Sequence, residues 1–143
     1  MGGEIKAFSL RFIMPGEAAL FASWERAERP YPWPASAFPA NTIVFETEAG
    51  VVGYAVVKVV AEEAYLSNFM VDPARRRQGI GSDILQKVIM WAESEGASAV
   101  VLDVDTKNDA AVNLYKKSGF EIVQERKASY PKGEDAYVMR KTT

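Results

Sequence analysis

The segment from Val71 to Gly81 constrains this chain more than any other part of the sequence. A strand-like run, Ala64–Val71, ends at Asp72-Pro73, three arginines and two glycines follow, and a helical pattern begins near Ser82. A strand, a glycine loop and a helix N-terminus together form an anion site, because glycine lets backbone N–H groups turn inward and the helix dipole favours negative charge. Arginine suits phosphate because its guanidinium is planar, charged and bidentate. The segment therefore predicts a site for a diphosphate.

The glycine pattern fits neither of two common phosphate loops. It lacks the third glycine of the dinucleotide fingerprint and the Lys-Ser/Thr pair of the P-loop. It matches Arg/Gln-x-x-Gly-x-Gly/Ala, here Arg76-Arg77-Gln78-Gly79-Ile80-Gly81. A second pattern follows it, Asn108-x-x-Ala111-x-x-Leu114-Tyr115-x-x-x-Gly119-Phe120. The two patterns resemble the paired acetyl-CoA motifs of the GNAT acetyltransferases, and the resemblance runs over nearly the whole chain.

Within that superfamily the chain is most similar to the RimI group, the ribosomal-protein-alanine N-acetyltransferases. Glu25-Arg26-Ala27 with Tyr31-Pro32-Trp33 resembles their early helices, and Tyr130-Pro131 with Gly133-Glu134-Asp135-Ala136 resembles their last hairpin. The resemblance implies an α/β GNAT fold in a single domain over residues 1–143. The expected mixed β-sheet has about seven strands flanked by about four helices, in the order β-α-α-β-β-β-α-β-α-β-β.

Hydrophobic periodicity supports this order. It predicts strands at about 8–12, 42–48, 51–60, 64–71, 99–104, 121–128 and 135–140, and helices at about 15–30, 82–96 and 109–118. The expected apolar face of the first helix is Leu20, Phe21, Trp24 and Ala27. The segment Tyr31–Pro39 mixes prolines with aromatic residues, so we expect a stiff loop or a short broken helix there.

Composition narrows the chemistry. The chain has 143 residues, 48% hydrophobic and 25% charged, which is typical of one water-soluble domain. A net charge of −2 argues against a general nucleic-acid or membrane-surface binder. No apolar run is long enough for a membrane span, and we expect a cytoplasmic protein. The chain has no cysteine and no histidine, so a thiol nucleophile and a His-based triad or zinc site are excluded, and we expect no metal.

Asp103 and Tyr115 are the candidate catalytic residues. Strand alternation places Asp103 on one face of its strand, opposite the face that holds Leu102 and Val104, and an aspartate in so apolar a strand needs a partner or a purpose. In RimI-like enzymes this position carries a glutamate general base. Aspartate is about 1.5 Å shorter, so a bridging water would be needed, and a purely structural carboxylate is the alternative. The resemblance assigns Tyr115 to the departing thiolate; the alternative is an aromatic core residue.

The remaining candidates follow from the resemblance. The strand residues that would meet the pantetheine arm and the oxyanion are Phe69, Met70 and Val71. Those assigned to the rest of acetyl-CoA are Arg76, Arg77, Gln78, Gly79, Ile80, Gly81, Ser82 and Asn108, although Asn108 is also explained as a helix cap. The acceptor groove is expected between Tyr31–Pro39 and Tyr130–Asp135, with Tyr31, Trp33 and Tyr130 as its contacts.

The resemblance implies transfer of an acetyl group from acetyl-CoA to a primary amine. The resemblance to the RimI group implies that the amine is the N-terminal α-amine of a protein, with a ribosomal protein as a candidate partner. An α-amine of pKa about 8 also loses its proton far more easily than a lysine side chain near 10.4. Two alternatives stay open. One is a small-molecule amine N-acetyltransferase, and the other is a non-catalytic acyl-CoA-binding module with a degraded acceptor site.

Overall fold

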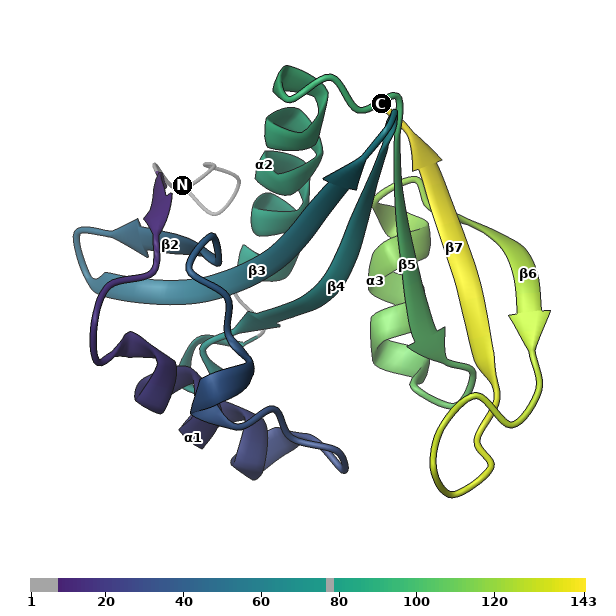
Figure 1. Cartoon of the computed structure of the whole chain (residues 1–143), viewed down its shortest axis with the longest axis horizontal. Coiled ribbons are helices and arrows are strands. Elements are labelled where there is room, and N and C mark those ends of the chain that lie inside the picture. Colours follow the sequence, from purple (N-terminus) through teal and green to yellow (C-terminus); the bar gives the residue numbers. More distant parts are fainter. Residues whose placement is uncertain (1–7, 77–78) are drawn as a thin grey trace. The chain divides into compact units, whose positions relative to one another are not determined.

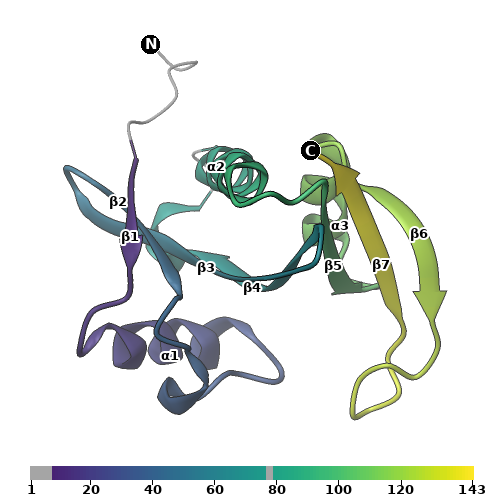
Figure 2. The same ribbon diagram turned by 45° about the horizontal axis from the view of Figure 1, so that its top comes forward.

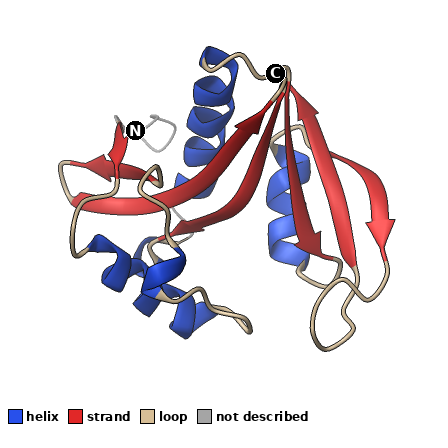
Figure 3. Cartoon of the chain, in the orientation of Figure 1, coloured by secondary structure: helices blue, strands red, loops and turns tan. Residues whose placement is uncertain are grey.

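The computed structural model describes residues 8–76 and 79–143, which form a mixed sheet and three α-helices (Figures 1 and 3). The elements in chain order are β1 Ser9–Phe12, α1 Glu17–Glu28, β2 Ile43–Thr47, β3 Gly50–Val60, β4 Glu63–Val71, α2 Ile80–Ser94, β5 Ala99–Asp105, α3 Asp109–Lys117, β6 Glu121–Arg126 and β7 Ala136–Thr142. The seven strands are hydrogen-bonded in the order β1-β2-β3-β4-β5-β7-β6. Strands β4 and β5 are parallel, whereas β5–β7 and β6–β7 are antiparallel.

The predicted α/β class, the mixed sheet and the order of the seven strands among the helices along the chain are confirmed, but the expected number of helices is wrong by one. In place of a second helix, the described residues after α1 form a short 3-10 turn at Ala35–Ala37. Proline lacks the N–H that a helix needs and disfavours helical geometry in the residue before it. Pro34 precedes the turn and Pro39 follows it closely, so the turn does not extend into an α-helix.

The chain divides into two compact units. The first comprises the residues up to Val57 together with Asn68–Ile84, and the second comprises Lys58–Ser67 and Leu85–Thr143. Strands β3 and β4 and helix α2 contribute residues to both units. That residues 1–143 act as one domain stays a prediction.

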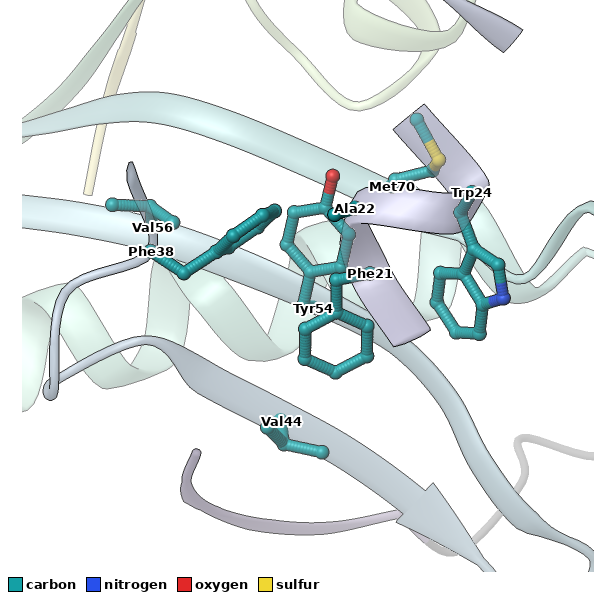
Figure 4. Packing of buried hydrophobic residues seen from close by; sticks show 8 residues of the cluster. All are labelled: Phe21, Ala22, Trp24, Phe38, Val44, Tyr54, Val56 and Met70. Carbon is teal, nitrogen blue, oxygen red and sulfur yellow. The ribbon is translucent and has the colours of Figure 1, made fainter. Parts of the chain in front are cut away.

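An aromatic cluster forms the core of the first unit (Figure 4). Phe21 of α1 lies with its ring centroid 4.7 Å from that of Tyr54 on β3 and 5.9 Å from that of Phe38. The expected apolar face of α1 is partly wrong, because Leu20 is 42% exposed and Ala27 is exposed, while Glu25 is buried. Ala22 is also buried, so the buried face is centred between Phe21 and Glu25. At about 100° per residue, this centre lies about 120° from Leu20, which therefore faces away from the core.

Strand β5 lies at the centre of the second unit, between β4 and β7. Its residues alternate as predicted: Val100, Leu102 and Val104 are buried, and the intervening side chains, including Asp103, are half-buried. Helix α3 runs along one face of β5 and β7 (Figures 1 and 2). Successive side chains of a strand point to opposite faces, so Asp103 lies on the face of the sheet opposite to Leu102 and Val104.

Candidate functional site

The glycine loop of the first unit has the geometry expected of an anion site. Gly79 has φ +75°, a left-handed conformation that favours glycine, and no atom lies within 4 Å of the position where a Cβ would be. Helix α2 begins at the next residue, Ile80. The first N–H groups of a helix have no intrahelical acceptor, and this applies to Ile80, Gly81 and Ser82. Gly79–Ser82 therefore fit a diphosphate; Arg77 and Gln78 lie outside the described residues.

Arg76 is already engaged in an ion pair in this structure. Its guanidinium hydrogen-bonds to the carboxylate of Glu28, at the C-terminal end of α1. The pair is partly exposed, with side-chain exposures of 45% for Arg76 and 30% for Glu28. A diphosphate that used Arg76 would compete with Glu28 for the guanidinium.

The end of β4 supplies the three residues predicted to meet the pantetheine arm and the oxyanion. Phe69 and Met70 are buried and Val71 is half-buried. Gly53 on β3 lies directly against this end: a Cβ there would be 2.7 Å from the Met70 carbonyl oxygen and 2.6 Å from Cδ1 of Ile84. Glycine thus allows β3 to approach both the predicted cosubstrate strand and α2.

A buried polar network ties α1 to β4. The Glu25 carboxylate, 1% exposed, accepts hydrogen bonds from the Tyr54 hydroxyl, from Asn68 Nδ2 at 3.1 Å and from the Trp33 backbone N–H at 3.0 Å. Arg29 donates to Asn68 Oδ1 at 3.2 Å and to the Phe69 carbonyl at 2.7 Å. The network therefore holds the strand end that is predicted to bind acetyl-CoA.

Tyr31 and Trp33, the predicted acceptor contacts of the first unit, are both half-buried. The Trp33 ring packs against the aromatic cluster, 5.4 Å from the ring of Phe38. The backbone N–H of Trp33 donates a hydrogen bond to the Glu25 carboxylate. These contacts give Trp33 a structural role, and its role toward an acceptor stays a prediction, as does that of Tyr31.

In the second unit, Asp103 lies among groups from three other segments. Its Oδ2 is 3.5 Å from Nη1 of Arg126 on β6, and its carboxylate hydrogen-bonds to the hydroxyl of Tyr65 on β4. Burial raises the pKa of Tyr65 to about 12, and the Asp103 carboxylate adds to the shift. Tyr130, from the turn between β6 and β7, also acts electrostatically on Tyr65. Two predicted site residues, Asp103 and Tyr130, are thus brought together around Tyr65.

Tyr115 and Asn108 lie on α3. Tyr115 is half-buried, and its ring centroid is 5.7 Å from that of Phe120, with the rings nearly perpendicular. Asn108 caps the helix, because its Oδ1 accepts a hydrogen bond from the Ala111 N–H at 3.2 Å. The cap explains why asparagine stands there, and a contact with acetyl-CoA stays a prediction.

Sequence reasoning missed several residues of these two sites. Glu25, Asn68, Tyr65 and Arg126 are all central to the contacts described above, and none was predicted. Asn68 carried a usable signal, since an amide within an apolar strand needs a partner. Arg126 carried none, because its link to Asp103 depends on how two distant strands pair.

No helix of the described chain is both long and apolar enough to cross a membrane. Within the same residues, the acidic side chains form no cluster of three or more that suits a metal ion.

Known proteins resemble this chain in sequence and in fold. The sequence matches the family model described as the acetyltransferase (GNAT) family over residues 11–120. It is 34% identical over 124 residues to the ribosomal protein bS18-alanine N-acetyltransferase of Escherichia coli K12, covering 80% of this chain and 84% of the relative. It is 36% identical over 122 residues to the N-alpha-acetyltransferase RimI of Mycobacterium tuberculosis, covering 77% of this chain and 75% of the relative.

A solved structure gives the same result. The crystal structure of the ribosomal-protein-S18-alanine N-acetyltransferase from Escherichia coli superimposes with a TM-score of 0.82 at 28% identity, covering 95% of this chain and 94% of the other. The family model spans more than half of the chain, and the relatives match most of their own length. The protein therefore belongs to the GNAT family of acetyltransferases.

Proposed function

We propose that this acetyl-CoA-dependent N-acetyltransferase acts on the N-terminal α-amine of a protein, with an alanine-starting ribosomal protein as the candidate acceptor. The observation that carries the proposal is the likeness to two N-terminal acetyltransferases over most of the chain. The left-handed Gly79 at the start of α2 supports the choice of cosubstrate, because an open glycine loop and free helix N–H groups suit a diphosphate.

The chain's own residues supply binding and proton transfer. Gly79–Ser82 would hold the diphosphate, and the backbone of Phe69–Val71 would hold the pantetheine arm and offer an N–H to the oxyanion. Acetyl-CoA, when bound, supplies an activated thioester carbonyl. Asp103 would accept a proton from the attacking amine through a bridging water, and the Tyr115 hydroxyl would give a proton to the departing sulfur. Much of the acceleration comes from holding the two substrates together.

An α-amine is a suitable acceptor for this set of residues. A carboxylate is a weak base, so it works best on an amine that loses its proton easily. An α-amine has a pKa of about 8, whereas a lysine side chain has one near 10.4. We therefore propose selectivity for N-termini over lysine side chains, in the cytoplasm and with no metal, membrane or nucleic acid involved.

A turnover assay with acetyl-CoA tests the proposal. We expect acetylation of peptides that begin with alanine, and none of the same peptides with a blocked N-terminus and an internal lysine. Preferred turnover of polyamines would make the protein a small-molecule acetyltransferase instead. Binding of acetyl-CoA with no turnover of any amine would make it an acyl-CoA-binding module.

Tyr115→Phe tests the assigned acid. Its hydroxyl would act on charge that develops only in the transition state, so its loss should lower kcat by about 10²–10⁴-fold while leaving acetyl-CoA affinity nearly unchanged. A variant that keeps half the parental kcat, with chemistry rate-limiting, would remove Tyr115 from the mechanism.

A further inference from the structure

The two oxygens of the Asp103 carboxylate have different surroundings. Oδ2 lies 3.5 Å from Nη1 of Arg126, and the carboxylate also receives the hydrogen bond of Tyr65. Oδ1 is buried and has no hydrogen-bond partner within the described part of the chain. A buried carboxylate oxygen without a hydrogen-bond donor lowers the stability of the fold. Its presence in a native structure therefore needs an explanation.

Strand register explains why these three side chains meet. Tyr65 on β4 is opposite Val101, two residues before Asp103 on the same face of β5. On the other side, Asp103 is opposite Val138 of β7, and Arg126 of β6 is opposite Ala136, two residues from Val138. Tyr65 is thus a diagonal neighbour of Asp103 on the adjacent strand, within reach of an aromatic side chain, and the long side chain of Arg126 reaches across β7. Strands β4 and β6 each direct one polar side chain at this carboxylate of β5.

We propose that Arg126 and Tyr65 are positioning residues that hold Asp103 so that its free Oδ1 receives the proton of the acceptor amine. The inference rests on the proposed function. In the step, the amine proton moves to Oδ1 through a bridging water, and the nitrogen lone pair forms the bond to the acetyl carbon. The bond between that carbon and sulfur then breaks, and its electron pair leaves with the sulfur.

The charges suit this division of roles. The cationic guanidinium of Arg126 lies 3.5 Å from the Asp103 carboxylate and attracts it, so it helps to orient the side chain. The raised pKa of Tyr65, about 12, keeps its hydroxyl protonated at neutral pH, so Tyr65 donates to Asp103 and does not compete for the amine proton. Two fixed partners also restrict the rotation of a short side chain, which has to present one oxygen in a defined direction.

Other titratable groups share this face and provide a matched control. They are Glu63 on β4, Asp105 on β5, Glu121 on β6, Arg140 on β7 and Tyr130 in the turn between β6 and β7. Arg140 is the closest match to Arg126, because its Nε lies 3.5 Å from Glu63 Oε2 and its side chain is 40% exposed against 50% for Arg126. It differs in pairing with Glu63 instead of Asp103.

The test is the pH dependence of kcat/KM for acetyl transfer to an alanine-starting peptide, measured on the parent, Arg126→Gln, Arg126→Lys, Tyr65→Phe and Arg140→Gln. We expect Arg126→Gln to lower the high-pH plateau of kcat/KM about tenfold, because Asp103 is then less well oriented toward the amine. Tyr65→Phe should lower the plateau as well. Arg126→Lys should restore the plateau, and Arg140→Gln should give the same plateau as the parent.

Plateaus that coincide in the parent, Arg126→Gln and Tyr65→Phe would overturn the inference while leaving the proposed function intact. The same holds if Arg140→Gln lowers the plateau as much as Arg126→Gln, because the effect would then be general to the charge of this face. A parent that acetylates no amine at any pH would overturn the proposed function, and the inference with it. Melting temperatures of all five proteins show whether each variant is folded.

Discussion

The buried carboxyl group of Glu25 offers the sharpest test of the structure. It is 1% exposed and accepts three hydrogen bonds, from the Tyr54 hydroxyl, Asn68 Nδ2 and the Trp33 backbone N–H. These donors come from β3, β4 and the loop after α1. One side chain therefore joins three segments of the first unit, and its replacement should be costly even though no apolar packing is removed.

The expected loss of unfolding free energy in a Glu25 variant follows from the number of hydrogen-bond donors that lose their acceptor. Glutamine in place of Glu25 keeps one acceptor oxygen, but its NH₂ group replaces the other and faces at least one donor. A buried donor that loses its acceptor in this way lowers the free energy of unfolding by about 1–3 kcal/mol. The Tyr54 hydroxyl is able to rotate and accept, so we expect Glu25→Gln to cost about 1–3 kcal/mol. Glu25→Ala leaves all three donors and a cavity, and we expect about 3–5 kcal/mol. Domains of this kind are stable by only about 5–15 kcal/mol.

Urea denaturation measures these costs, provided that the slope of the transition stays constant. Glu93→Gln is the matched control, because Glu93 is an exposed glutamate on α2; we expect a change within about 0.5 kcal/mol. A double-mutant cycle of Glu25→Gln with Tyr54→Phe should give a coupling above about 0.5 kcal/mol, as expected for groups in contact. If Glu25→Gln matched the control, the buried network would not exist as described.

Three further predictions follow. Gly79→Val should weaken acetyl-CoA binding about 5- to 30-fold by calorimetry, because a left-handed backbone costs a residue with a Cβ about 1–2 kcal/mol; unchanged affinity would contradict it. Glu28→Gln should tighten acetyl-CoA binding up to about fivefold by freeing Arg76 from an exposed ion pair, whereas Arg76→Gln should weaken it; equal affinities would contradict it. Burial raises the pKa of Tyr54, so the unfolded chain ionises first and stability falls as pH rises above about 10; Tyr54→Phe should reduce this fall in alkaline urea titrations, and an identical slope would contradict it.

Local patterns predicted much of the fold. The alternation around Leu102 and the helical stripe after Ser82 are short-range signals, and both gave the right elements. One failure was local in origin, because proline near Ala35–Ala37 limited the expected helix to a 3-10 turn. The other was not, because the face of α1 was off by one position and a residue's burial depends on what packs against it.

What the sequence determined by itself is the glycine–arginine loop, the family and the candidate acid and base, because these depend on residue type and spacing along the chain. Only the tertiary structure decided the partners. Asp103 meets Arg126 across 23 positions of sequence, and Glu25 meets Asn68 across 43. Such contacts depend on strand register and on how a helix packs on a sheet, and a shift of one residue in register would turn Asp103 to the other face. No short-range pattern carries that information.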